Sequence, residues 1–228
     1  MQNKFYHYIQ SRFHKYRTRL PKMIYLLESR VVIFFSKGRQ KYELVESSAY
    51  HDCKSRRMTE RALELSFLLD ELKKWNMESH VNPIVEVGAV TPYVFPGLIK
   101  DIVDAADPHT LVNRKVDLFE CDFHNRNVVS ISTIEHVGTG EYGLEKRSGA
   151  PEALEKIYNE SKHCFITWPI GYNTVLDKFV YENYKSIVEV YKRGKYDNLW
   201  TKEASTVDVF NTTYDKNRFA DAVAIIRK

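Results

Sequence analysis

Short apolar runs separated by polar segments recur along the chain from residue 84 onward. Each run has the length and the β-branched content of a buried strand. The alternation of these runs with helical or loop segments predicts a mainly parallel sheet with crossover connections, which is an α/β fold. The predicted strands are IVEVGAV, DIVDAAD, KVDLFECDF, NVVSISTIEH, CFITWPIGYN and ADAVAIIRK.

Three further segments have the apolar spacing of helices. The clearest covers residues 59–75, where Thr59 can cap the first turn. A second regular helix is predicted over 150–162, and residues 181–203 have the helical spacing of a core-packing segment. Helices between the early strands must be short, because TPYVFPGLIK contains two prolines. The apolar positions of the first helix are Leu63, Phe67, Leu68, Leu72 and Trp75.

The beginning of the chain differs from the rest in composition. Residues 1–40 hold nine lysines and arginines against one acid, Glu28, together with several aromatic residues. This composition predicts a basic, aromatic helical extension over residues 1–55, followed by an α/β domain over 56–228. The extension either packs on the domain or docks on an anionic membrane surface or a partner enzyme. No recognised RNA or DNA motif accompanies it, so nucleic acid is not expected as a partner.

The sequence also bears on the cellular compartment. The apolar stretch 23–35 is interrupted by Glu28, Ser29 and Arg30 and is shorter than the ~20 residues of a membrane-spanning helix. We expect no transmembrane segment, and no signal peptide, because charges precede this stretch and no small-residue cleavage site follows it. The three cysteines form no CxxC pair, which argues against zinc and disulfides. The reducing cytoplasm is the expected compartment.

Polar residues follow the predicted strands at the points where they end. Because parallel strands end at one edge of a sheet, ligands collect there. Gly88 has no Cβ, so the backbone can turn sharply and a ligand can approach its amides. A carboxylate after the second strand can accept two hydrogen bonds from ribose hydroxyls, and Asp107 is better spaced for this role than Asp104. The other candidates are Glu86 in the first strand, Asp122 after the third, and Glu135 and His136 after the fourth.

Each candidate also has a structural interpretation. The two acids after the second strand can be solvated residues, Asp122 and Glu135 can cap turns, and His136 can be a structural histidine. Glu86 is more informative, because a carboxylate buried in an apolar strand requires a partner. No metal site is predicted, since the remaining histidines share no metal-ligand spacing with the cysteines. These histidines include His51, His109, His124 and His163.

The segments IVEVGAV, DIVDAAD and above all VVSISTIEHVGTGEYG resemble class I S-adenosylmethionine-dependent methyltransferases, in particular a bacterial group associated with surface-polysaccharide gene clusters. RMTERALEL and WPIGYN extend the similarity over most of residues 55–228. The chain departs from the family in its first motif, where Ala89, Val90, Thr91 and Pro92 replace the usual further glycines. The resemblance implies a Rossmann-like fold with an antiparallel last strand, ADAVAIIRK.

The resemblance also implies a function. We expect S-adenosylmethionine as cofactor and O-methylation of a sugar in surface polysaccharide biosynthesis, such as O-antigen or capsule. The acceptor would be a saccharide or lipid-linked saccharide. Residues 1–40 would then bring the enzyme, as a peripheral protein, to the inner face of the membrane or to a glycosyltransferase partner.

The candidate residues take defined roles if the resemblance holds. The methionine end of the cofactor would lie over Glu86 and Gly88, its ribose would meet Asp107, and Asp122 would make a further contact near the base. His136 would act as a base, and Glu135 would orient either that imidazole or the substrate. The sugar would be contacted by Tyr142, Arg193 and Trp200. Tyr142 lies in the loop 138–143, which either closes over the substrate or only connects two elements.

Two other functions remain open at this point. One is a non-catalytic scaffold of the same fold in a polysaccharide assembly complex, which the missing glycines favour. The other is an enzyme that uses a different nucleotide, such as a nicotinamide cofactor. The full GxGxxG pattern that a dinucleotide site uses is absent from the sequence.

Overall fold

The structure is a computed structural model that describes residues 60–78, 83–141, 149–194, 200–203, 209–214 and 220–228. The chain divides into two compact units, Met1–Leu44 and Val45–Lys228, and all described residues belong to the second. The basic extension predicted over 1–55 and the cap predicted at Thr59 therefore lie outside the described residues. Within the described part of the chain, none of the helices has the length and apolar character needed to cross a membrane.

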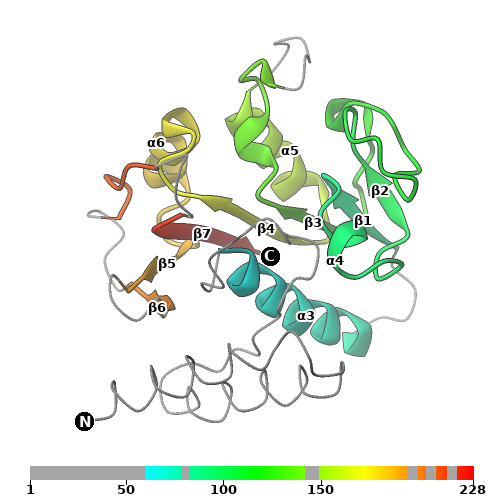
Figure 1. The fold of residues 1–228 in the computed structure, drawn as a ribbon, viewed down its shortest axis with the longest axis horizontal. Coiled ribbons are helices and arrows are strands. Elements are labelled where there is room, and N and C mark those ends of the chain that lie inside the picture. The colour runs from blue at the N-terminus through cyan, green and yellow to red at the C-terminus, as the bar shows by residue number, and fades with distance from the viewer. Residues whose placement is uncertain (1–59, 79–82, 142–148, 195–199, 204–208, 215–219) are drawn as a thin grey trace, which may run out of the picture. The chain divides into compact units, whose positions relative to one another are not determined.

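A seven-stranded sheet forms the centre of this unit, in the order β2-β1-β3-β4-β7-β5-β6 (Figure 1). Four parallel strands make up one half: β1 (Ile84–Val87), β2 (Asp101–Val103), β3 (Asn127–Ile131) and β4 (His163–Pro169). The other half is antiparallel and contains β7 (Ala222–Arg227), β5 (Glu189–Arg193) and β6 (Trp200–Lys202). The expected α/β fold with a mainly parallel core and an antiparallel last strand is therefore confirmed.

Helices cover both faces of the sheet (Figure 1). On one face, α5 (Ala150–Glu160) and α6 (Thr174–Asn183) share a core with alternate residues of β3 and β4. On the other face, α3 (Glu60–Glu78) packs on β3 and β4, and its Phe67 ring lies 5.0 Å from the Tyr191 ring of β5. Because both faces are covered, the inner strands are almost entirely buried, which explains their continuous apolar runs.

Two of the predicted helices are confirmed and one is wrong. The helices predicted over 59–75 and 150–162 correspond to α3 and α5, and the five apolar positions of the first are all buried. In the segment 181–203, the first three residues end α6, and the described residues after them contain β5 and β6 rather than a helix. β5 is extended because it pairs with β7 along its length, and two consecutive residues of it, Val190 and Tyr191, are buried.

One predicted strand is also wrong. KVDLFECDF forms a turn around the short helix η2 (Leu118–Glu120), because the Asp117 carboxylate accepts a hydrogen bond from the Phe119 amide and so caps that helix. Another element was not predicted: α6, whose first turn is capped by the Asn173 side chain. The short connection expected after the first strand is present as α4 (Thr91–Val94).

The strand order reverses at β1. The chain passes from β1 to β2 on one side and then crosses to β3 on the other side of β1. The connections that leave the carboxyl ends of β1 and β3 therefore run in opposite directions, and the gap between them is where an open α/β sheet binds ligands.

Candidate active site

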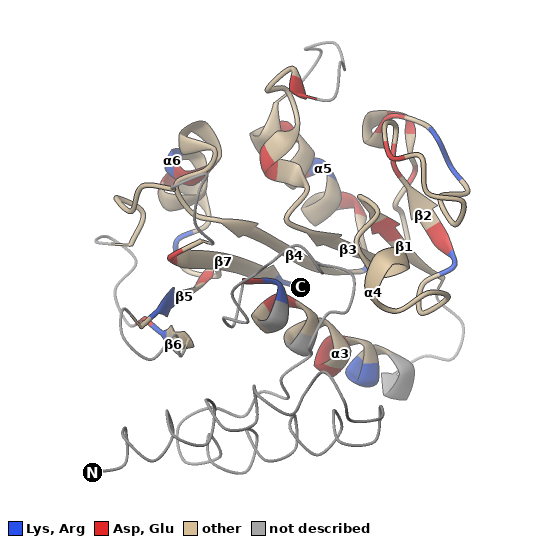
Figure 2. Cartoon of the chain, viewed as in Figure 1, with Lys and Arg blue, Asp and Glu red and all other residues tan. Residues whose placement is uncertain are grey.

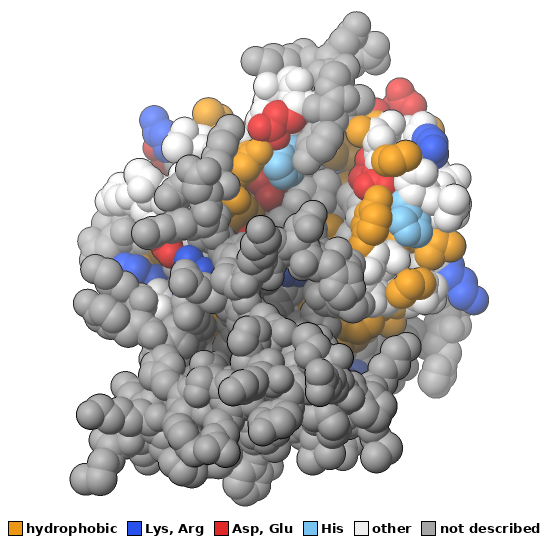
Figure 3. Space-filling model, in the orientation of Figure 1, with side chains coloured by type: hydrophobic (Ala, Val, Ile, Leu, Met, Phe, Trp, Pro, Cys, Tyr) orange, Lys and Arg blue, Asp and Glu red, His pale blue; other side chains and the backbone are white. Residues whose placement is uncertain are grey.

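A cavity of about 430 Å³ lies at the carboxyl ends of β1, β2 and β3. Its volume falls within the roughly 300–1,000 Å³ that is typical of small-molecule sites. The wall consists of the turn after β1, the loop after β2, η2, and the segment after β3 that contains η3 (Ile134–His136). On the face that carries these strand ends, histidine and carboxylate side chains lie among hydrophobic ones (Figure 3).

Gly88 forms the part of the cavity wall where the segments after β1 and β3 meet. Its φ of +86° lies in the left-handed region, and its amide donates a hydrogen bond to the Val103 carbonyl at 2.9 Å. A Cβ at this position would lie 2.0 Å from Thr133 Oγ1 and 2.5 Å from Thr133 Cγ2. Both the backbone and the space therefore require glycine here, and the sequence-predicted site residue does line the cavity.

Glu86 is fully buried, and its carboxylate faces the turn after β1. It accepts hydrogen bonds from the amides of Val90 at 3.0 Å and Thr91 at 2.7 Å, and from the Thr91 hydroxyl. Burial raises the pKa of this carboxyl to about 7, although the hydrogen bonds oppose the rise. The start of α4 thus provides the hydrogen-bond partners that a buried carboxylate requires. Glu86 is not among the described residues that line the cavity.

Two acids follow β2, and both line the cavity. Asp104 braces the surrounding backbone, because its carboxylate accepts from the amides of Ala89 at 3.0 Å and of Ala106 and Asp107 at 2.9 Å each. Asp107 accepts from the His109 amide at 2.7 Å and from the Tyr93 hydroxyl at 2.9 Å. A carboxylate offers about four acceptor positions, so Asp107 retains capacity for a ligand hydroxyl. Figure 2 shows acidic residues in the loop beyond β2.

His136 borders the cavity and contacts a carboxylate that the sequence did not indicate. Its Nδ1 lies 2.5 Å from Oε2 of Glu141, which also lines the cavity. The hydroxyl of Tyr172 donates to both oxygens of Glu141, at 2.8 and 2.7 Å. The His136 and Tyr172 rings meet edge to face with their centroids 4.7 Å apart. Three side chains from two loops thus form one hydrogen-bonded group, and both missed residues lie in motifs that carry the resemblance, GTGEYG and WPIGYN.

Glu135 lies behind His136 rather than in the cavity wall. Its side chain is 1 % exposed, and burial raises the pKa of its carboxyl well above the ordinary value. Its Oε1 is 3.7 Å from His136 Nε2, beyond hydrogen-bonding distance, and its Oε2 has no hydrogen-bond partner among the described residues. The Asn173 side chain donates to the backbone carbonyl of Glu135 at 2.8 Å. Glu135 therefore borders the imidazole as a buried carboxyl group and does not form a hydrogen bond with it.

Helix α3 brings an arginine to the cavity that the sequence analysis also missed. Arg61 lines the cavity, and its guanidinium donates to Glu64 at 3.1 Å and to the Ile131 carbonyl at 3.4 Å. Glu64 is fully buried and accepts from the hydroxyls of Ser132 at 2.5 Å and Thr167 at 2.8 Å. Both residues lie in RMTERALEL, the helical segment that carries part of the resemblance.

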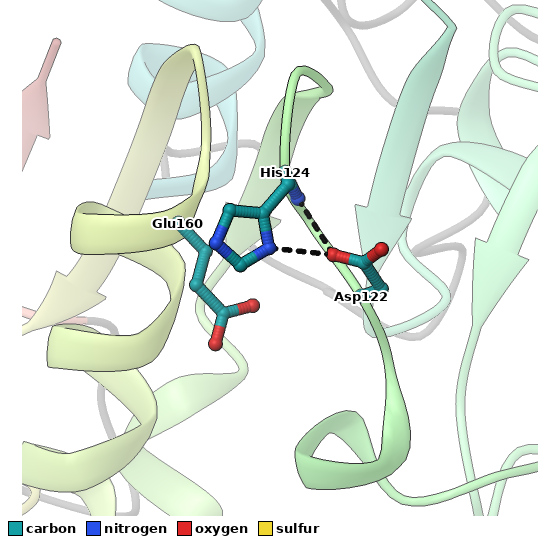
Figure 4. A group of neighbouring side chains, drawn as sticks. All are labelled: Asp122, His124 and Glu160. Carbon is teal, nitrogen blue, oxygen red and sulfur yellow. Dashed lines mark hydrogen bonds and ion pairs between the residues drawn. The ribbon is translucent and has the colours of Figure 1, made fainter.

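Asp122 does not join the cavity. It precedes β3 and therefore lies at the amino end of that strand, because the predicted strand before it is absent. Its carboxylate, 81 % exposed, contacts His124 Nδ1 at 2.7 Å, and Glu160 lies nearby (Figure 4). Glu160 is paired with Lys156 at 2.7 Å. Although the three potential metal ligands lie within 4.8 Å of one another, their contacts are those of a solvated surface network.

The residues predicted to contact a sugar are not brought to the cavity. Arg193 ends β5 and forms an ion pair with Asp221 at 2.7 Å. Trp200 in β6 is 1 % exposed, so its ring faces are covered and offer no stacking surface. Both residues lie in the antiparallel half of the sheet, beyond β7. Tyr142 lies outside the described residues.

The chain was also compared with known proteins. It matches no protein-family model, no curated protein and no solved structure.

Proposed function

We propose that the chain is an S-adenosylmethionine-dependent methyltransferase with a Rossmann-like fold, and that the cavity at the ends of β1, β2 and β3 holds the cofactor. The reversal of strand order at β1 supports this location. The antiparallel β7, placed next to β4, agrees with the last strand that the methyltransferase resemblance implies.

The hydrogen bonds of Glu86 favour S-adenosylmethionine over a dinucleotide as the cofactor. Dinucleotide-binding folds place a pyrophosphate on the free amides at the start of the helix that follows the first strand. Here the Glu86 carboxylate already accepts from the amides of Val90 and Thr91, and α4 is only four residues long. A phosphate would compete with a buried carboxyl for these donors. S-adenosylmethionine has no phosphate, so this turn favours it over a nicotinamide dinucleotide.

The charge of the cavity fits the same ligand. Four acidic residues line it, Asp104, Asp107, Asp117 and Glu141, whereas Arg61 is the one lysine or arginine among the described residues of its wall. A sulfonium and an ammonium group are favoured by such a surplus of negative charge. We assign the ribose hydroxyls to Asp107 and the carboxylate of the methionine end to Arg61, whose guanidinium suits that group.

The residues of the cavity have simple tasks in this reaction. S-adenosylmethionine, when bound, supplies a methyl group that is activated by a positively charged sulfur. The protein holds an acceptor oxygen in line with that methyl group, and positioning of this kind contributes ~7 kcal/mol or more to catalysis. His136 borders the cavity and can accept the proton of an acceptor hydroxyl. From the resemblance, we propose a saccharide or lipid-linked saccharide of a surface polysaccharide as the acceptor.

Calorimetric titration with S-adenosylmethionine and S-adenosylhomocysteine tests the assignment. We expect both to bind, and Asp107→Ala to weaken binding at least tenfold, because two charge-assisted hydrogen bonds to the ribose are lost. Asp122→Ala is the matched control, since this exposed acid lies outside the cavity, and it should leave the affinity unchanged. If neither compound binds the natural chain, the non-catalytic scaffold is the better explanation.

A further inference from the structure

We propose that Glu141 is a positioning residue that holds the His136 imidazole in the tautomer with its proton on Nδ1, so that Nε2 carries the lone pair. The role in methyl transfer rests on the proposed function, whereas the tautomer is a property of the cavity itself. Neither residue type nor spacing indicated this pair in the sequence.

The contacts of Glu141 determine the direction of the hydrogen bond. An ionised carboxylate only accepts, so the His136 Nδ1 that lies 2.5 Å from Glu141 Oε2 must be the donor. The Tyr172 hydroxyl also donates to this carboxylate, at 2.8 and 2.7 Å. Donors from two separate loops therefore fix one carboxylate, whose side chain is still 38 % exposed to the water that solvates its charge.

The contact with Glu141 favours the histidine tautomer that is less populated in water. In water, free histidine carries its proton mainly on Nε2, and in proteins the hydrogen bond at one ring nitrogen sets the state of the other. A proton held on Nδ1 by Glu141 makes Nε2 the basic nitrogen. Glu135 Oε1 is 3.7 Å from Nε2, and the other ionisable side chains among the described residues of the cavity wall are those of Arg61, Asp104, Asp107 and Asp117.

The tautomer has a direct consequence for methyl transfer. When an acceptor hydroxyl forms its bond to the methyl carbon, the electron pair of the broken carbon–sulfur bond stays on sulfur, and the hydroxyl proton passes to Nε2. The imidazolium ion that results lies 2.5 Å from the Glu141 carboxylate, which stabilises the new positive charge. Glu141 thus acts through His136 and need not touch the acceptor.

Nitrogen NMR of the full chain labelled with ¹⁵N-histidine reads the tautomer without any activity measurement. Under alkaline conditions in which the imidazole is neutral, we expect His136 to show a protonated Nδ1 and an unprotonated Nε2. The variant His136→Gln identifies its signals. Glu141→Ala should shift the population toward the Nε2–H form, and Glu141→Gln should restore the Nδ1–H form, because its amide oxygen still accepts. A natural chain with the proton on Nε2, or an unchanged tautomer in Glu141→Ala, would overturn the proposal.

Asp122→Asn is the matched control, because Asp122 contacts His124 Nδ1 at 2.7 Å on the exposed side of the molecule. It should alter only the His124 signals. The titration with S-adenosylmethionine separates this proposal from the proposed function. An Nδ1–H tautomer in a chain that does not bind the cofactor supports the role of Glu141 and removes the methyltransferase. Cofactor binding with an Nε2–H tautomer removes the positioning role alone.

Discussion

At the scale of single residues, Glu86 combines complete burial with three hydrogen bonds to the start of α4. Desolvation penalises its charged form more than these bonds stabilise it, so the pKa of the carboxyl rises from 4.5 to about 7. The folded chain therefore holds a proton at this site between these two values, where the unfolded chain has lost it.

The raised pKa predicts a pH-dependent stability. Because the folded state binds more protons than the unfolded state between pH 4.5 and about 7, the contribution of Glu86 to stability is full below pH 4.5 and is lost as the pH rises to about 7. Relative to Glu86→Gln, the natural chain should lose about 2–3 kcal/mol of unfolding free energy between pH 5 and pH 8. Urea unfolding of both proteins at the two pH values measures this. The other buried acids contribute equally in both proteins, so they do not affect the comparison. An equal pH dependence of the unfolding free energy in the natural chain and in Glu86→Gln would therefore contradict the prediction.

Part of the candidate site could be predicted from the sequence at this scale. Gly88, Asp107 and His136 follow different strands, yet they meet in the cavity because parallel strands end at one edge. Glu141 and Tyr172 could not be paired in advance, since their contact depends on the paths of two loops. The prediction for Asp122 depends on KVDLFECDF being a strand, and this segment forms a turn around η2 instead.

At the scale of elements, α3 is attached to the sheet by polar as well as apolar contacts. Its apolar spacing was sufficient to predict the helix, because buried positions recur with the helical period. The spacing could not reveal Glu64, which is buried and accepts hydrogen bonds from Ser132, just after β3, and from Thr167 within β4. The helix predicted over 181–203 is wrong for a related reason. Consecutive buried residues such as Val190 and Tyr191 of β5 also occur in a helical pattern, so the spacing alone does not distinguish the two.

The buried Glu64 predicts a large effect of a single substitution. Glu64→Ala removes the buried carboxylate that accepts from Arg61 and from two hydroxyls, so we expect the unfolding free energy at pH 7 to fall by about 3–5 kcal/mol. Asp70→Ala on the same helix removes only an exposed pair with Lys73 and should change it by less than about 0.5 kcal/mol. Denaturant unfolding of both variants gives the comparison, and similar small losses would show that Glu64 does not anchor the helix.

At the scale of the whole molecule, the net charge of +4 hides an uneven distribution, because nine lysines and arginines fall within the first 40 residues. We propose that this segment, which lies outside the described residues, brings the protein to an anionic membrane surface. Each basic residue near such a surface contributes about 1 kcal/mol, and salt screens the attraction.

Sedimentation with lipid vesicles tests this proposal. The full chain should pellet with vesicles that contain anionic phosphatidylglycerol at low salt and should be released at high salt. Neutral phosphatidylcholine vesicles are the control and should leave it in the supernatant. A chain that remains in the supernatant with the anionic vesicles at low salt would count against membrane attraction.

The position of β7 has a consequence for how the protein is made. Residues 222–227 follow β5 and β6 in the chain but lie between β4 and β5 in the sheet. While the ribosome is still adding the residues that precede 222, β4 and β5 each have one edge that lacks its final partner, because both pair with β7 in the sheet. Unpaired edges of this kind recruit other strands. Protection by chaperones is therefore needed most during the seconds before β7 emerges.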